Sequence, residues 1–121
     1  MTALAQRVFK TKWFTKAAKD VGITDKELCK AAQQLIEGQA DDLGGNVWKK
    51  RLSMNTPRSI VINKIGEFWV FVFLFAKSDM ENIDERELKD FKKLAKNYGK
   101  LTMAEVDEFV EAKKFVEICN A

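Results

Sequence analysis

The chain has 121 residues and a net charge of +3, and 46% of its residues are hydrophobic, 32% charged and none histidine. This length and composition predict one globular domain, residues 1–121, rather than a disordered chain. The absence of histidine excludes a conventional Ser-His-Asp triad and an imidazole base, and no P-loop, GxGxxG or metal-ligand pattern occurs. An enzyme would therefore have to use lysine, arginine, tyrosine or carboxylates.

The sequence favours a cytoplasmic chain. The longest apolar run, Phe68–Ala76, has nine residues, whereas a membrane-spanning helix needs about 20. The first ten residues lack the apolar core of a signal peptide. Cys29 and Cys119 are far apart in the sequence and match no metal spacing, so we expect two free thiols in a reducing compartment.

The N-terminal third predicts a strand followed by a helical hairpin. Ala5–Lys10 can form a short strand, after which Thr11 offers an N-cap for a helix that Gly22 ends. Thr24, with a glutamate three residues later, forms a capping box for a second helix that ends at Gly38. The connection between the two helices is short, which is typical of an antiparallel pair.

After residue 45 the hydrophobic period changes from 3.6 to 2. Asp41–Gly45 lacks the ligand spacing of a calcium loop and is interpreted as a turn. Strands follow at Val47–Ser53, Arg58–Asn63 and Phe68–Ala76, and their short connections predict an antiparallel meander. The third strand is apolar on both faces, so we expect it to be central and covered on one side by the helices.

The C-terminal third predicts two more helices. Asp84 can cap a helix that runs to about Tyr98, and Thr102 with Glu105 forms a capping box for a short helix. Phe115–Cys119 is a candidate strand. The predicted fold class is α+β: a small antiparallel sheet packed with the N-terminal helical hairpin and the C-terminal helices. The sheet would comprise the three-stranded meander, the N-terminal strand and the candidate C-terminal strand.

Positive charge is concentrated in the middle of the chain. Residues 46–77 carry six basic side chains and one acidic one, whereas residues 78–121 carry eight basic and eleven acidic. Such a local positive field is typical of a surface that binds an anion or a nucleic acid.

Within this segment, VWKKRLSMNTPRSIVINK, alternation places Lys49 and Arg51 on one face of their strand. If the turn sets Arg51 opposite Arg58, Lys49 opposes Ile60 and the three cations share that face. Like charges directly opposite each other are destabilising, so the cluster requires either solvent or an anion between its members. Two interpretations therefore remain open, a solvated outer face and a phosphate-binding face.

The aromatic residues on helix faces are interpreted as core. They are Trp13, Phe14, Phe91 and Phe109. Trp48 and Trp69 could stack on a nucleobase if they were exposed, but we expect both to pack in the core.

Four segments in order resemble the RelE-like toxins of the RelE/ParE toxin–antitoxin superfamily. They are KWFTKAAKDVGITDKELCKAA, DLGGNVWKKRL, the strand that begins at Arg58, and FAKSDMENIDERELKDFKKLAK. Together these segments cover nearly the whole chain, and their order and spacing carry the resemblance. It implies the RelE-like fold, a small antiparallel sheet with two N-terminal helices packed on it.

The resemblance also implies a function, that of a type II toxin acting as a ribosome-dependent mRNA endonuclease (mRNA interferase). In this family the RNA 2′-hydroxyl attacks the neighbouring phosphate, so no metal or cofactor is implied. By position, Lys49 matches an active-site lysine, Arg51 lies where a second lysine is usual, and Arg58 matches the arginine on the scissile phosphate. Lys77 is expected to assist. Because a guanidinium is a poor base, Lys49 is the expected proton-transfer group.

The partners that the resemblance implies are a cognate antitoxin and mRNA in the ribosomal A site, with no membrane and with a toxin–antitoxin heterotetramer as the expected assembly. Two alternatives remain: a non-catalytic ParE-like toxin that binds DNA gyrase, and an inactive relative that retains antitoxin or RNA binding. They are favoured by Ser78 and by the position near Asp84, where relatives usually carry an arginine and a tyrosine. Tyr98 is the only tyrosine of the chain.

Overall fold

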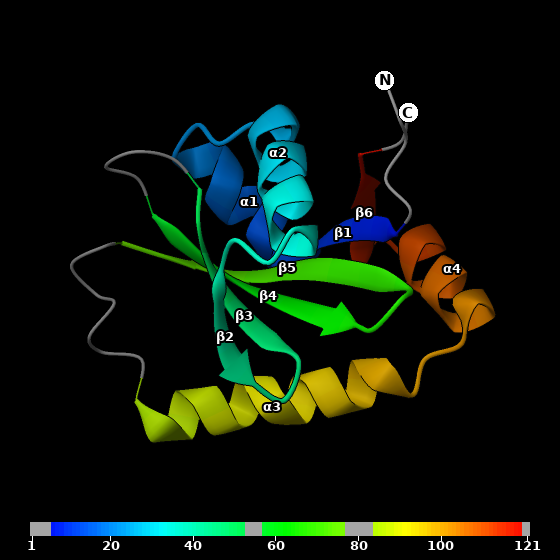
Figure 1. Cartoon of the computed structure of the whole chain (residues 1–121). Coiled ribbons are helices and arrows are strands. Elements are labelled where there is room, and N and C mark those ends of the chain that lie inside the picture. Colours follow the sequence, from blue (N-terminus) through cyan, green and yellow to red (C-terminus); the bar gives the residue numbers. More distant parts are fainter. Residues whose placement is uncertain (1–5, 53–56, 77–83, 120–121) are drawn as a thin grey trace.

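A six-stranded sheet with helices on both faces is the frame of the computed structural model, which describes residues 6–52, 57–76 and 84–119 (Figure 1). The strands are β1 (Arg7–Thr11), β2 (Asp41–Gly44), β3 (Val47–Arg51), β4 (Arg58–Lys64), β5 (Phe68–Phe75) and β6 (Phe115–Ile118). The helices are α1 (Lys12–Asp20), α2 (Asp25–Ile36), α3 (Glu85–Gly99) and α4 (Met103–Glu111). The predicted α+β class is confirmed, and so are the N-terminal and C-terminal strands.

The strand order is β2-β3-β4-β5-β1-β6. Strands β3, β4 and β5 form the predicted antiparallel meander, with β5 in the interior of the sheet. The sheet is not wholly antiparallel, because β1 pairs in parallel with β5 from Arg7 opposite Phe68 to Lys10 opposite Phe71. The C-terminal strand β6 then pairs with the outer side of β1 in the antiparallel sense.

Strand β2 corrects the interpretation of residues 41–45 as a turn. Asp41–Gly44 pairs with β3, and only Gly45 and Asn46 connect the two strands. Both connecting residues have positive φ, 62° and 66°, which is the conformation of a two-residue type I′ hairpin. Aspartate and glycine disfavour strands, but hydrogen bonding to β3 overrides that local preference.

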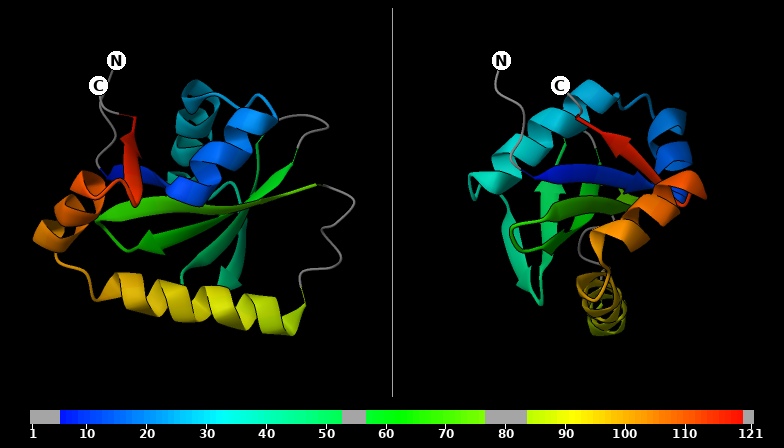
Figure 2. Two further views of the ribbon diagram at one scale, coloured as in Figure 1. Left: turned by 180° about the vertical axis from the view of Figure 1, so that it is seen from behind. Right: turned by 90° about the vertical axis from the view of Figure 1, so that its right-hand side faces the viewer.

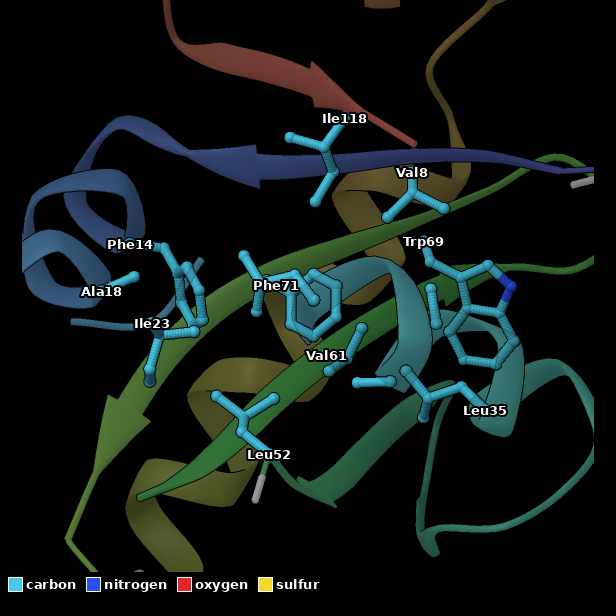
Figure 3. Packing of buried hydrophobic residues seen from close by; sticks show 13 residues of the cluster. Val8, Phe14, Ala18, Ile23, Leu35, Leu52, Val61, Trp69, Phe71 and Ile118 are labelled. Atoms are coloured by element: carbon cyan, nitrogen blue, oxygen red, sulfur yellow. The ribbon is translucent and has the colours of Figure 1, made fainter. Parts of the chain in front are cut away.

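Helices cover both faces of the sheet, whereas the sequence predicted cover on one side. Figure 2 shows α1 and α2 on one face of the sheet and α3 on the other. Under α1 and α2, Phe14 and Leu28 pack with Val61 and Phe71 in one buried cluster (Figure 3). The opposite cluster buries the alternate strand residues against α3 and α4; its members include Phe9, Ile60, Ile62, Val70, Ala95 and Val106. The alternating side chains of β4 and β5 thus contribute to both clusters.

The helices begin at the predicted residues. Thr11, Thr24 and Asp84 each accept a hydrogen bond from the backbone N–H three residues later. At α4 the capping box is complete, since Thr102 accepts from the Glu105 N–H and the Glu105 carboxylate accepts from the Thr102 N–H. These side chains satisfy N–H groups that have no partner within the helix. No helix in the described part of the chain is long and apolar enough to cross a membrane.

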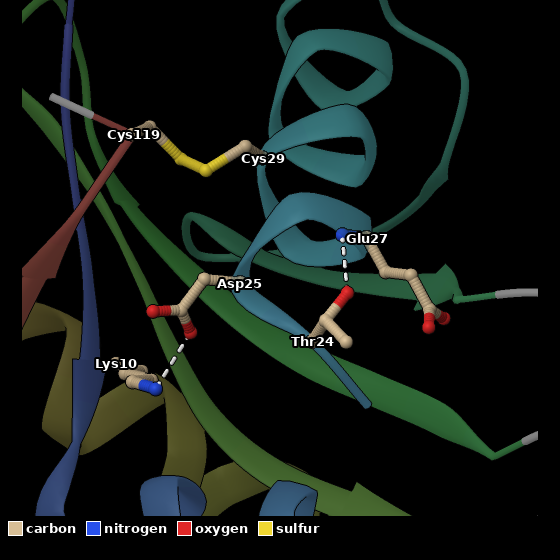
Figure 4. Close-up of a disulfide and its surroundings, with 6 residues drawn as sticks. All are labelled: Lys10, Thr24, Asp25, Glu27, Cys29 and Cys119. Carbon is tan, nitrogen blue, oxygen red and sulfur yellow. Dashed lines mark hydrogen bonds and ion pairs between the residues drawn. A yellow bond between two sulfur atoms is a disulfide. The ribbon is translucent and has the colours of Figure 1, made fainter. Parts of the chain in front are cut away.

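The prediction of two free thiols is wrong, because Cys29 and Cys119 form a disulfide (Figure 4). Cys29 lies on α2 and Cys119 directly follows β6. Their Cα atoms are 5.4 Å apart although 90 positions separate them in the sequence, and that distance is usual for a disulfide. Pairing of β6 with β1 brings the C-terminal strand beside α2, a juxtaposition that the sequence spacing alone did not reveal.

Candidate functional site

The strand register sets Arg51 directly opposite Arg58 and Lys49 opposite Ile60, as the alternation predicted. Residues opposite each other in an antiparallel pair point to the same face of the sheet. Ile60 belongs to the cluster under α3, so Lys49, Arg51 and Arg58 lie on the α3 side at the end of the meander. The predicted common face is therefore confirmed.

These three cations line one pocket of about 330 Å³ at the edge of the sheet. The complete lining is Gln39, Ala40, Asp41, Lys49, Lys50, Arg51 and Arg58. Four cationic side chains and one carboxylate thus surround the same space, and the excess of positive charge favours an anionic ligand.

Strand β2 begins at the pocket and supplies its carboxylate. Asp41 pairs with Lys49 across β2 and β3, and the Lys49 Nζ lies 3.3 Å from the Asp41 Oδ2. The Lys49 side chain is 21% exposed and that of Asp41 is 69% exposed. An incoming phosphate would therefore reach Lys49 by displacing an exposed, weakly held carboxylate rather than a buried one.

The two arginines differ in burial. Arg58, the first residue of β4, is 7% exposed, whereas Arg51, the last residue of β3, is exposed. A charged group that packing holds in place needs little reorganisation when negative charge develops beside it. Arg58 therefore suits a fixed contact with a phosphate, and Arg51 suits a contact that forms as the ligand arrives.

Lys50 is a pocket residue that the sequence interpretation did not include. It is 8% exposed and its Nζ donates a hydrogen bond of 2.8 Å to the carbonyl oxygen of Gln39. Burial, and after it the charge of Arg51, lower the pKa of Lys50, while Asp41 acts in the opposite direction. Its ammonium group therefore loses a proton more readily than that of an ordinary lysine.

A sequence signal for Lys50 was present in the alternation. Lys50 shares its strand face with Trp48 and Leu52, so it is a lysine on an otherwise apolar face. Both neighbours pack with the cluster under α1 and α2. A lysine in that position must reach a polar partner, and the backbone at Gln39 provides one.

Of the other residues considered for the site from the sequence, only Tyr98 can be placed relative to the pocket. Lys77 lies outside the described residues, as does Ser78. Tyr98 packs edge-on against Phe115 of β6 with ring centroids 5.3 Å apart, and β6 is at the opposite edge of the sheet from the β2–β3 side. Burial there raises the pKa of Tyr98 to about 12.

The interpretation of Trp13 as core is wrong, since the residue is 52% exposed. Phe14, the next residue, is fully buried as predicted. Trp69 is buried and meets Trp48 edge-on at 5.9 Å, which agrees with core packing of this pair. The sequence pattern assigned both residues to one apolar face, but adjacent residues of a helix point in directions about 100° apart, and here only Phe14 points into the core.

Comparison with known proteins identifies the class of protein to which this fold and cationic pocket belong. Residues 6–118 match the family described as the RelE toxin of the RelE/RelB toxin–antitoxin system. No curated protein and no solved structure matches the chain significantly. The protein is a toxin of a type II toxin–antitoxin system, for which the family implies a cognate antitoxin as partner. The chain belongs to the RelE toxin family.

Proposed function

We propose that this toxin is a ribosome-dependent mRNA endonuclease and that the pocket at the end of β3 and β4 holds the scissile phosphate. The observation that carries the proposal is the direct opposition of Arg51 and Arg58, with Lys49 beside them in the same pocket. Like charges placed opposite each other destabilise a sheet. An anionic ligand in the pocket would be attracted by both charges.

The reaction needs no metal, because RNA carries its own nucleophile. The 2′-hydroxyl oxygen attacks the adjacent phosphorus, the bond to the 5′-oxygen breaks, and a 2′,3′-cyclic phosphate and a 5′-hydroxyl result. Negative charge accumulates on the phosphoryl oxygens in the transition state. Positioned cations that contact those oxygens lower the barrier, which is the role proposed for Lys49, Arg51 and Arg58. Lys77 is proposed to assist them.

Proton transfer falls to a lysine, since a guanidinium does not release its proton in proteins. Lys49 shares the sheet face of both arginines and is the candidate by family position. Lys50 lines the same pocket and has the lowered pKa, so it is the second candidate. A general base works best when its pKa lies near the pH of the reaction. Family position therefore favours Lys49, whereas the lowered pKa favours Lys50.

The proposed setting is the cytoplasm, with mRNA in the ribosomal A site as substrate. The antitoxin would present an acidic or amphipathic segment to the cationic pocket, and a toxin–antitoxin heterotetramer is the proposed assembly. The chain is proposed to act as a single domain, residues 1–121.

The test is cleavage of a defined mRNA by the purified protein, with and without programmed ribosomes. We expect cuts only with ribosomes, and we expect Arg58→Gln to reduce the cleavage rate at least a hundredfold while its circular dichroism stays unchanged. Arg86→Gln is the matched control, because Arg86 is an exposed arginine on α3. Equal cleavage by wild type and Arg58→Gln, or cleavage without ribosomes, would contradict the proposal.

A further inference from the structure

An exposed indole lies at the same end of the sheet as the cationic pocket. Trp13 stacks on Phe73 with ring centroids 5.1 Å apart and an interplanar angle of 17°. Despite this contact, Trp13 remains 52% exposed. Phe73 occupies one face of the indole, so an aromatic surface stays open to solvent next to a ring that fixes its orientation.

Phe73, the ring on which Trp13 stacks, contacts two further aromatic rings. Phe73 packs on Phe91 of α3 at 5.6 Å and on Phe75 of the same strand at 6.1 Å. We call Trp13, Phe73, Phe75 and Phe91 the aromatic ladder. Because three of its members belong to β5 and α3, the position of the Trp13 ring is set by regular elements rather than by a loop.

Strand register connects the aromatic ladder to the pocket. Phe75 is the partner of Arg58, and Phe73 is the partner of Ile60, across β4 and β5. The described pairing of β1 with β5 ends at Lys10 opposite Phe71, and Trp13 lies just beyond that point. Phe73, on which Trp13 stacks, lies one strand across from Arg58 and two residues along, so the indole and the Arg58 backbone are on the order of 10 Å apart. A short single strand of RNA can bridge that distance.

Two exposed lysines flank the indole along α1. Lys12 directly precedes Trp13 and Lys16 follows it by one helical turn, and both are exposed. Proteins that bind single-stranded nucleic acid combine aromatic faces for the bases with cations for the backbone. Trp13 and these two lysines supply both components.

We propose that Trp13 is a stacking platform for one base of single-stranded RNA, in a nucleotide that flanks the phosphate held at Arg58. This inference rests on the proposed function, because it places a second subsite on the same substrate. Every nucleobase has a π-face, so the platform supplies affinity and positioning with little preference for one base. The charge beside the indole favours RNA over an apolar protein segment as its occupant.

The test is binding of a short single-stranded RNA whose ribose 2′-oxygens are methylated, so that it cannot attack its own phosphate. Fluorescence polarisation of the labelled RNA would compare wild type with Trp13→Leu, Trp13→Phe and Arg58→Gln. We expect Trp13→Leu to weaken binding by roughly five- to a hundredfold, and Trp13→Phe to retain most of the affinity. Val21→Ala is the matched control, since Val21 is an exposed apolar residue at the other end of α1.

A series of RNAs, each lacking the base at one position, separates the contribution of base stacking from that of the backbone charge. At the abasic position that meets Trp13, wild type and Trp13→Leu should bind equally. Loss of binding in Arg58→Gln with unchanged binding in Trp13→Leu would overturn the platform and leave the proposed function standing. No binding by the wild type would overturn the platform, whereas the proposed function is tested separately by cleavage on programmed ribosomes. Unchanged RNA binding by Trp13→Leu together with weaker antitoxin binding would show that Trp13 contacts protein instead.

Discussion

Arg51 and Arg58 are direct partners across β3 and β4, and together with Lys49 they line one pocket. Side chains opposite each other on one sheet face have Cβ atoms about 5 Å apart, so two guanidinium groups on such partners repel each other unless something negative lies nearby. The relationship places two like charges against each other at the pocket, and like charges directly opposite each other weaken the pairing of two strands.

Replacing Arg51 by threonine should therefore stabilise the free protein. We expect the free energy of unfolding in urea to rise by about 0.2–1 kcal/mol, because one of two opposed charges is removed and threonine suits a strand. The same variant should lose cleavage activity. The stability gain should shrink at high salt, where exposed charges are screened. A variant less stable than the wild type at low salt would argue against repulsion at this pair.

Lys50→Arg distinguishes the two lysines proposed for proton transfer. The substitution keeps a positive charge and removes a group that can act as a base, so the cleavage rate should fall about 10²- to 10⁴-fold if Lys50 takes the proton. The wild-type rate should rise with pH and level off above the lowered pKa of Lys50. An arginine variant that keeps the wild-type rate and pH profile would leave Lys49 as the candidate.

The disulfide joins α2 to the end of β6 and closes a loop of about 90 residues. In the chain-entropy account such a cross-link stabilises by about 4–5 kcal/mol, although measured values are usually about 2–4 kcal/mol. We expect the double variant Cys29→Ser, Cys119→Ser to unfold at a markedly lower temperature than the oxidised wild type. Reductant should lower the wild-type Tm by a similar amount and leave the double variant unchanged.

A wild-type Tm that reductant does not alter would show that the bond contributes little. The comparison also bears on the proposed cytoplasmic setting, where thiols are kept reduced. Activity measured with and without reductant would show whether the pocket depends on this link.

Titration of Tyr98 at alkaline pH tests whether its hydroxyl is buried between α3 and the sheet. It is the only tyrosine, so the ultraviolet absorbance of tyrosinate reports on it alone, and the midpoint in the folded protein should be about pH 12. Because the folded pKa is raised above the usual value near 10, its contribution to stability is present below pH 10 and is lost as the pH rises toward 12. The variant Tyr98→Phe should not show this decrease in stability between pH 10 and pH 12. A midpoint near 10 in the folded protein would contradict burial of the hydroxyl.

Local sequence signals predicted the meander, the helix starts and the register of Arg51 with Arg58, because each depends on residues close together in the chain. Capping at Thr11, Thr24, Asp84 and Thr102 and alternation in β3 are interactions of this kind. The common face of Lys49, Arg51 and Arg58 followed from the same local pattern.

What the sequence analysis missed depends on contacts between two elements rather than on a pattern within one element. Strand β2 exists because β3 lies beside it, and the Cys29–Cys119 bond exists because β6 joins the far side of β1. Lys50 enters the pocket because the α2–β2 connection supplies the Gln39 carbonyl. In each case the partner lies outside the element concerned, so periodicity and capping within one element did not reveal the contact.

The central claim is that the cationic pocket makes this protein an mRNA-cleaving toxin, and growth on induced expression tests it most directly. Wild type and Arg58→Gln would be induced side by side in cells without the antitoxin, with primer extension on a reporter mRNA. We expect the wild type to arrest growth and to leave codon-phased cuts that are absent from the variant. Arrest without cuts, or equal cuts from a folded Arg58→Gln, would contradict it.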